Sequence, residues 1–199
     1  MSGSFPISSA KFQSLGIKSM QNTIISKSQS GKKLARQIDG QRFGFTARII
    51  TAKRSDVYGE LMAFIIKQRS QKENFTIIPP EVEDARGTAS GTPHGTASAG
   101  ATSITLGGTG TGTLLAGDFI KFANHDKIYM VVADQSDIST GSLTIEPPLT
   151  TAVSSSDIQY DNVPFTVHLT NDMQNFGVVG ADKDGNALYQ FEIDVEETL

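Results

Sequence analysis

The sequence contains no cysteine and no tryptophan in its 199 residues. Without cysteine, the chain has no disulfide framework, no thiolate ligand for a metal ion and no cysteine nucleophile. It also has no apolar run approaching the ~18 residues that a membrane-spanning helix needs, and residues 1–9 lack the charged-then-apolar pattern of a signal peptide. We therefore expect a protein that is made in the cytoplasm and has no contact with membranes.

Helix signals are scarce as well, whereas glycine, serine and threonine are abundant, which favours a mainly β fold. The clearest strand is expected at residues 41–51, where side chains alternate with the period of a half-buried strand. A second extended segment is expected at residues 75–78, just before a pair of prolines. The apolar face of the first strand would carry Phe43, Phe45, Ala47 and Ile49.

Between these two segments the sequence predicts one α-helix. Ser55 stands where an N-cap residue is expected, and Asp56 follows it near the positive end of the helix dipole. Apolar residues then recur at helical spacing, and no second helix of this quality follows. We therefore expect a small β-sandwich or barrel flanked by one helix. The apolar stripe of that helix comprises Val57, Tyr58, Leu61, Met62, Phe64 and Ile65.

The composition changes after residue 80 and changes back near residue 160, which predicts two domains. Residues 87–99 are rich in glycine, alanine, serine and threonine, and have the composition of a linker. Residues 100–158 contain several short strands separated by turns, which suggests a small closed β-barrel of the OB-like kind. We therefore expect a discontinuous first domain, residues 1–86 and 160–199, with the OB-like β-barrel inserted into it.

The N-terminal part of the chain offers two turn signals. Residues 28–33 form a polar and basic loop after a strand expected at residues 17–27. The Asp39-Gly40 pair is a typical hairpin turn, and it stands between residues 34–38 and the strand expected from residue 41. We therefore expect residues 34–38 to pair with that strand.

The net charge of −4 hides an asymmetry between the two parts of the chain. Residues 1–86 hold fourteen Lys and Arg against seven Asp and Glu, a net charge of +7, whereas residues 87–199 carry −11. Two complementary surfaces of this kind suit a head-to-tail contact between neighbouring copies in a ring. The candidate interface residues are Lys27, Lys32, Lys33 and Arg36 on the basic side, with Glu192, Asp194, Glu196 and Glu197 on the acidic C-terminal strand.

The C-terminal strand alternates apolar and acidic residues, so we expect it to present an amphipathic edge to a neighbouring copy. An equally weighted alternative is that both charged sets simply face solvent. A further alternative is that the basic half binds nucleic acid. That alternative is disfavoured, because the basic residues are spread along the chain without interleaved aromatics or a known reading helix.

No motif in the sequence predicts catalysis, a cofactor or a metal ion. Residues 107–112 are rich in glycine but lack the phosphate-loop pattern and a following helix. His94, His125 and His168 have no metal-ligand spacing, and residues 182–186 lack the order of acidic residues in a calcium loop, so a turn is expected there. The chain contains no G-x-S-x-G elbow. We therefore expect a protein that is not an enzyme.

Two segments of the inserted region resemble the distal tail proteins of long-tailed bacteriophages. Residues 116–122 read Ala-Gly-Asp-Phe-Ile-Lys-Phe, and residues 124–129 read Asn-His-Asp-Lys-Ile-Tyr. They are similar to an "AGD-hydrophobic-K" strand and an "H-x-K-V-Y" return strand in the two-domain kind found in T-five-like siphophages. Residues 146–149, Glu-Pro-Pro-Leu, are similar to the end of a later strand. The acidic strand at residues 188–197 also matches in character.

The resemblance implies a tail-tube-like β-sandwich with a flanking helix, which forms a hexameric ring between the tail tube and the distal tip. The inserted OB-like domain would project outward, toward other tail parts or fibres. The implied partners are further copies of the chain, the tail tube protein, the tail tip or baseplate hub protein and fibres. DNA would pass through the lumen in transit only. The implied location is the virion tail, assembled in the host cytoplasm.

The sequence leaves two alternative functions. A carbohydrate-binding attachment module would use the small barrel, but it needs exposed aromatic side chains, and strand alternation places at least some of Phe119, Phe122 and Tyr129 inside. A tail-tube or tail-terminator subunit would be similar in the first domain but normally lacks the insertion.

Overall fold

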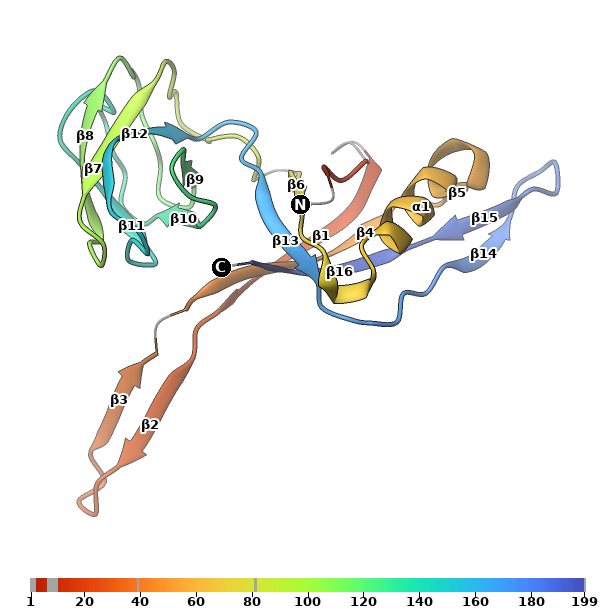
Figure 1. Ribbon diagram of the computed structural model, residues 1–199, viewed down its shortest axis with the longest axis horizontal. Helices are drawn as coiled ribbons and strands as arrows, with labels where there is room; N and C mark the ends of the chain where they lie inside the picture. The colour runs from red at the N-terminus through yellow and green to blue at the C-terminus, as the bar shows by residue number, and fades with distance from the viewer. Residues whose placement is uncertain (1–2, 7–10, 39, 81, 199) are drawn as a thin grey trace.

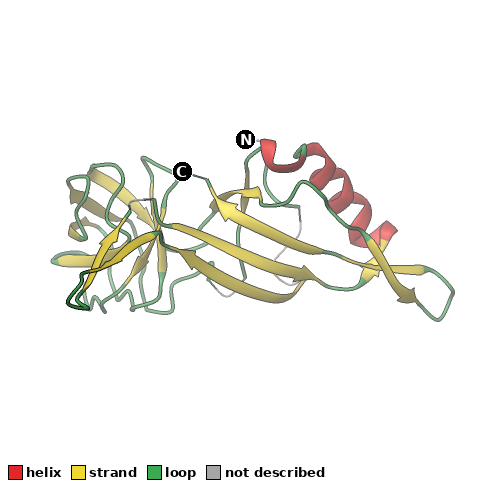
Figure 2. Cartoon of the chain, turned by 90° about the horizontal axis from the view of Figure 1, so that it is seen from below, coloured by secondary structure: helices red, strands yellow, loops and turns green. Residues whose placement is uncertain are grey.

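The computed structural model describes residues 3–6, 11–38, 40–80 and 82–198. The fold is mainly β, with one α-helix, a five-stranded sheet and a closed β-barrel of six strands (Figures 1 and 2). This architecture confirms the expected fold class at that level. Within the described part of the chain, no helix is long and apolar enough to cross a membrane.

The five-stranded antiparallel sheet combines segments from both ends of the sequence. Its strands in spatial order are β1 (Phe12–Met20), β4 (Arg42–Ile49), β16 (Glu192–Glu197), β13 (Phe165–Leu169) and β6 (Phe75–Ile77). A smaller three-stranded sheet contains β14 (Gly177–Ala181), β15 (Ala187–Gln190) and β5 (Ala52–Lys53). The predicted long C-terminal strand is therefore two strands, β15 and β16, that belong to different sheets.

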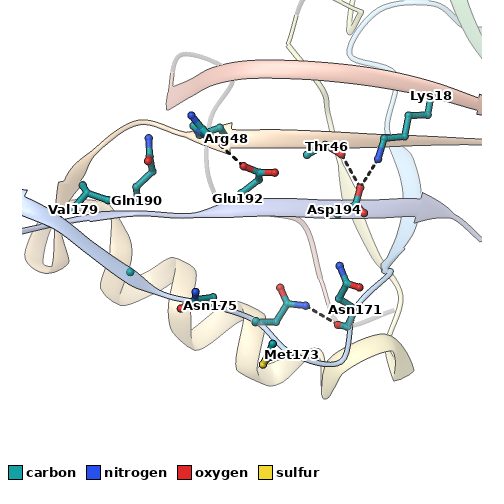
Figure 3. Close-up of a pocket in the computed structure, with 12 residues that line it drawn as sticks. Lys18, Thr46, Arg48, Asn171, Met173, Asn175, Val179, Gln190, Glu192 and Asp194 are labelled. Atoms are coloured by element: carbon teal, nitrogen blue, oxygen red, sulfur yellow. Dashed lines mark hydrogen bonds and ion pairs between the residues drawn. The ribbon is translucent and has the colours of Figure 1, made fainter.

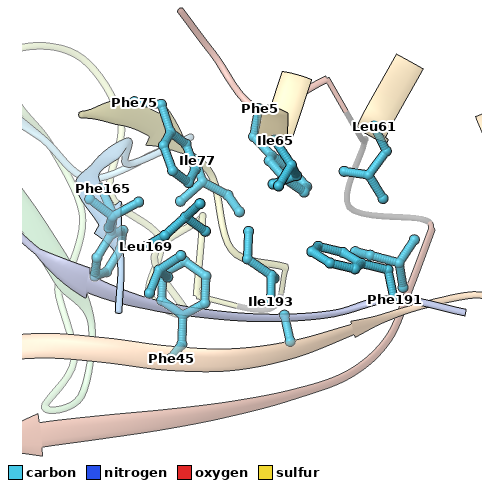
Figure 4. Packing of buried hydrophobic residues seen from close by; sticks show 14 of the residues in the cluster. Phe5, Phe45, Leu61, Ile65, Phe75, Ile77, Phe165, Leu169, Phe191 and Ile193 are labelled. Carbon is cyan, nitrogen blue, oxygen red and sulfur yellow. The ribbon is translucent and has the colours of Figure 1, made fainter. Parts of the chain in front are cut away.

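One face of the five-stranded sheet carries the core, as the alternation in β4 predicts. Phe43, Phe45, Ala47 and Ile49 are all buried there. The helix α1 (Gly59–Lys67) covers this face, and Figure 4 shows its Leu61 and Ile65 facing the sheet near Ile193 of β16. The buried helix face is thus the predicted one.

The start of the helical segment differs from the expectation. A π-helical turn, η2 (Arg54–Tyr58), precedes α1, and a short 3₁₀ turn, η3 (Ser70–Lys72), follows it. The N-cap position is Lys53, whereas the hydroxyl of Ser55 donates to the Asp56 carboxylate. The predicted Ser55 cap is therefore wrong, because the helical backbone already begins before that residue.

A long two-stranded arm extends from the five-stranded sheet (Figure 1). It consists of β2 (Thr23–Lys27) and β3 (Lys33–Gln37), which pair with each other just beyond the paired strands β1 and β4. The turn lies at residues 28–32, where the N–H of Ser28 donates to the Lys32 carbonyl and Gly31 adopts a φ of 81°.

The hairpin turn expected at Asp39-Gly40 is therefore wrong. Residues 34–38 pair with β2, and β4 pairs with β1, so the chain reverses at residues 28–32 instead. Gly31 supplies the left-handed backbone that this turn requires. Asp39 itself lies outside the described residues.

The inserted region forms a closed six-stranded barrel in the order β10-β11-β8-β7-β12-β9. Its strands are β7 (Pro93–Ala97), β8 (Ser103–Gly108), β9 (Phe119–Phe122), β10 (Ile128–Val131), β11 (Ser142–Glu146) and β12 (Val153–Gln159).

The barrel begins earlier than the expected boundary at residue 100. Residues 93–97 of the predicted 87–99 linker form strand β7, and Ser90 pairs with Thr111. The small residues in this segment are explained by close packing. A Cβ on Gly95 would lie 2.6 Å from a ring carbon of Phe122, so only glycine fits at that point of the barrel wall.

The barrel and the sheet also share part of one core. Phe119 and Ile128 come from barrel strands but belong to the apolar cluster beneath the sheet. The ring centroids of Phe43 and Phe119 lie 5.2 Å apart in an edge-to-face arrangement. The remaining barrel side chains form a second cluster of their own.

Candidate functional surfaces: a polar sheet face, a buried ion pair and a basic arm

The second face of the five-stranded sheet is polar, and its charges are paired across strands. Arg42 of β4 lies 2.9 Å from Glu196 of β16, and Arg48 lies 3.2 Å from Glu192. Arg48 and Glu192 are directly opposite in the register of the two strands. These pairs arise because two strands with alternating apolar and charged residues place their charged sides on the same face.

Asp194 is the centre of this polar face. Its carboxylate accepts hydrogen bonds from Lys18 at 3.0 Å, from Thr46 at 2.8 Å and from Thr170 at 3.0 Å. Partial burial opposes its ionisation, but these three donors outweigh burial and lower the pKa of the carboxyl below its usual value. Asp194 therefore remains charged. It is held in place by side chains from β1, from β4 and from the residue that follows β13.

The structure contradicts the expected edge position of the acidic strand. β16 lies between β4 and β13 and hydrogen-bonds to both of them. Glu192, Asp194 and Glu196 are compensated by cations of the same chain. The sequence pattern cannot distinguish a central strand with one polar face from an edge strand, because both alternate with the same period.

A groove of about 550 Å³ lies on this polar face, beside the segment at residues 171–177 (Figure 3). The sheet contributes charged side chains to its floor, and the segment contributes amide side chains and the exposed Met173. The groove is lined by Lys18, Thr46, Arg48, Asn171, Met173, Gln174, Asn175, Gly177, Val179, Gln190, Glu192 and Asp194.

Glu197, at the end of β16, occupies a different environment from the other three acidic residues. Its side chain is fully buried at the junction of sheet and barrel, 2.5 Å from Nζ of Lys127. Its carboxylate also accepts the backbone N–H of Phe43 at 3.0 Å and that of Ile128 at 2.7 Å. Glu197 is therefore not available to a neighbouring copy, and its expected role as an interface residue is wrong.

Lys127 is buried with only 3% of its side chain exposed. Its ammonium group also donates to Oε1 of Gln41 at 3.1 Å and lies 5.0 Å from the ring centroid of Phe43. Burial lowers the pKa of Lys127, and the charge of Glu197 opposes that shift. The ammonium and carboxylate groups thus connect the barrel to the sheet by a buried ion pair.

Sequence reasoning missed Lys127 and Gln41 as members of this buried cluster. The one sequence feature that could have indicated a buried lysine is the position of Lys127 directly before the apolar stretch at residues 128–131. The signal does not reveal a partner, since Glu197 lies 70 positions away and in another sheet.

The predicted basic residues lie on the arm or at its turn. Every residue of β2 and β3 is exposed. Lys27, Lys32, Lys33 and Arg36 form no ion pair within the described ranges. Apolar side chains accompany these cations, since Ile24 and Leu34 are 56% and 54% exposed.

The remaining sequence candidates have local roles. His125 and Tyr129 are hydrogen-bonded at 2.8 Å, and burial lowers the pKa of His125. The expected turn at residues 182–186 is confirmed: Asp182 accepts the N–H groups of Asp184 and Asn186. Among the described residues, no three histidine, aspartate or glutamate side chains are grouped so as to hold a metal ion.

A scan against models of known protein families finds none that matches this chain, and a search of curated proteins finds no match either.

Proposed function

We propose that this protein is a structural component of a bacteriophage tail, which forms a hexameric ring at the distal end of the tail tube. The ring connects the tube to the tail tip or baseplate hub protein and to fibres, and DNA passes through its lumen. The protein is located in the virion tail after assembly in the host cytoplasm. The proposal rests on the sequence resemblance together with one feature of the structure.

That feature is the charge-compensated polar face of the five-stranded sheet. DNA in transit requires a wall that is hydrophilic but does not retain phosphate groups through unpaired cations. On this face Arg42, Arg48 and Lys18 are each paired with a carboxylate of β16. A ring with this face toward its axis has such a wall, while the opposite apolar face remains covered by α1 within each copy.

In this proposal the five-stranded sheet and α1 form the tail-tube-like domain. The resemblance to distal tail proteins implies that this domain is a β-sandwich with a flanking helix. The six-stranded barrel is the OB-like insertion and projects from the ring. The protein carries out no catalysis and uses no cofactor, and its function lies in the contacts that it makes.

The carbohydrate-binding alternative is not supported by the barrel aromatics. Phe119, Phe122 and Tyr129 are at most 5% exposed. A sugar ring stacks on an exposed aromatic face, and these three side chains have none to offer.

Sedimentation equilibrium of the purified protein tests the assembly. We expect a species of six times the chain mass of 21.3 kDa. A protein that remains monomeric at every concentration, with and without its proposed tail-tube partner, contradicts the proposed function.

A further inference from the structure

We infer that Lys127 and Gln41 form an intramolecular isopeptide cross-link, assisted by Glu197, which joins the barrel covalently to the five-stranded sheet. The new amide bond connects Nζ of Lys127 to Cδ of Gln41, and one ammonia molecule is released. The reaction is a single self-modification of each chain, without turnover, and it is independent of the proposed function.

The nucleophile and the carboxamide are already in contact. Nζ of Lys127 lies 3.1 Å from Oε1 of Gln41, so with a carbonyl bond of about 1.23 Å the carbon Cδ is at most roughly 4.3 Å away. Reacting atoms need to be about 3–3.5 Å apart, so a movement of about 1 Å or less brings Nζ into that range. The carboxamide is fixed from its other side, because its NH2 group donates to Oγ of Ser19 at 2.9 Å.

Glu197 is placed to take the proton that makes lysine a nucleophile. Its Oε2 lies 2.5 Å from Nζ, and the backbone N–H groups of Phe43 and Ile128 hold the carboxylate. Lysine attacks a carboxamide only as the neutral amine. Burial lowers the pKa of Lys127, and the positive charge of Arg42 acts in the same direction, whereas the charge of Glu197 opposes the shift.

The burial of the three groups favours the reaction. The side chains of Lys127 and Glu197 are 3% and 0% exposed, and Gln41 is 3% exposed. The ring of Phe43 closes one side, with its centroid 5.0 Å from Nζ. Two buried charges carry a desolvation cost, and exclusion of water suppresses hydrolysis of the intermediate. Conversion of the ion pair into a neutral amide and a neutral carboxyl group therefore removes that cost.

The atoms and charges of the step balance. Glu197 first takes one proton from the ammonium group of Lys127. The lone pair of Nζ then forms a bond to Cδ of Gln41, and a carbonyl electron pair moves to Oε1. Glu197 gives its proton to Nε2 and takes a second proton from Nζ. The carbonyl reforms, the Cδ–Nε2 bond breaks and ammonia leaves. Glu197 ends as a neutral carboxyl group, and no oxidant, metal or further reactant is consumed.

The cross-link joins segments that are distant in the sequence. Gln41 directly precedes β4 and Lys127 directly precedes β10, 86 positions later. The ion pair is the state in which the chain folds, and the covalent bond forms from it. The bond restricts the unfolded chain in the way that a disulfide does, so the barrel stays attached to the sheet even when either part unfolds.

Mass spectrometry of the intact wild-type chain tests the inference directly. During incubation at neutral pH, we expect a rising fraction of chains whose mass is below the sequence mass by one ammonia molecule. Trypsin does not cut after an acylated lysine, and residues 128–182 contain no Lys or Arg. Digestion of these chains should therefore release residues 37–42 joined to residues 122–183. This linked peptide separates the cross-link from loss of ammonia elsewhere in the chain.

Three variants assign the roles. Glu197→Gln keeps both reacting groups but removes the proton acceptor, so the linked peptide should be lost. Lys127→Arg keeps a positive charge but removes the amine, with the same expected result. The matched control is Lys121→Arg, which removes a lysine amine from the more exposed pair with Asp126 and should leave the cross-link in place. Circular dichroism of each variant confirms that it is folded.

Two results overturn the inference without any variant: wild-type chains that keep their full sequence mass after several days, or that lose ammonia without yielding the linked peptide. An undiminished yield of the linked peptide from folded Glu197→Gln protein also overturns it, because Glu197 would then have no part in the reaction. None of these results bears on the proposed ring, which sedimentation tests separately.

Discussion

Replacing Lys127 by methionine tests whether the barrel is held to the sheet by a buried ion pair. Methionine keeps the length and much of the volume of the lysine stem, so the change removes mainly the charge. Within the described part of the chain, Glu197 then remains as a fully buried carboxylate whose hydrogen-bond donors are the backbone N–H groups of Phe43 and Ile128. Removal of one partner of a buried pair generally costs about 3–5 kcal/mol, because the other charge stays buried without compensation.

A loss of this size is large enough to measure in a thermal melt. For a chain of this length, each 1 kcal/mol shifts Tm by roughly 2–4 °C, so Lys127→Met should lower Tm by roughly 6–20 °C. Adding Glu197→Gln removes the buried charge, and the double variant should recover most of the loss. The matched control is Lys121→Met, which breaks the more exposed pair with Asp126 and should cost at most about 1 kcal/mol.

Thermal melts followed by circular dichroism distinguish these outcomes. The reasoning is refuted if Lys127→Met melts at the wild-type temperature. It is also refuted if the double variant is less stable than Lys127→Met, because the loss would then come from packing and not from an uncompensated charge.

Three further predictions concern the core, a turn and the barrel wall. Leu61→Ala should cost roughly 2–5 kcal/mol in urea denaturation, whereas Ile66→Ala, at an exposed position of the same helix, should have little effect. The hydrogen bond from Lys53 lowers the pKa of Asp182 well below its unfolded value of about 3.9. Its contribution to stability is therefore fully present above that pH and is lost progressively as the pH falls toward the lower pKa of the folded state. The wild-type advantage over Asp182→Asn should accordingly shrink in melts at increasingly acid pH. Gly95→Ala should destabilise the barrel in urea denaturation, because the new methyl group meets an aromatic ring. An unchanged midpoint would contradict this prediction and show that the barrel wall makes room for the methyl group.

Local periodicity made part of the fold predictable. The alternation from Phe43 to Ile49 and the helical stripe containing Leu61 and Ile65 each depend on which face of one element is buried. Phe43, Phe45, Ala47, Ile49, Leu61 and Ile65 are buried as predicted, whereas Met62 and Phe64 of the predicted stripe are only partly buried. Such patterns are encoded within about ten consecutive residues, so they can be seen without knowledge of any partner.

The features that sequence reasoning missed depend on contacts between distant segments. Strand β7 resembles a linker in composition, and only the nearby Phe122 ring explains Gly95. In the sequence, Glu197 cannot be distinguished from the three acidic residues before it in the same strand. The structure shows that it differs from them, because it forms a buried ion pair with Lys127 of the barrel. The pairing of β2 with β3 likewise follows from the turn at residues 28–32 and not from the stronger signal at Asp39-Gly40.

Negative-stain electron microscopy of the purified protein tests the central claim most directly. The account predicts class averages of rings with sixfold symmetry, an open centre and six peripheral projections that are the barrels. Particles without rotational symmetry, or closed rings with the barrels filling the centre, would contradict the proposal that the polar sheet face surrounds a passage for DNA.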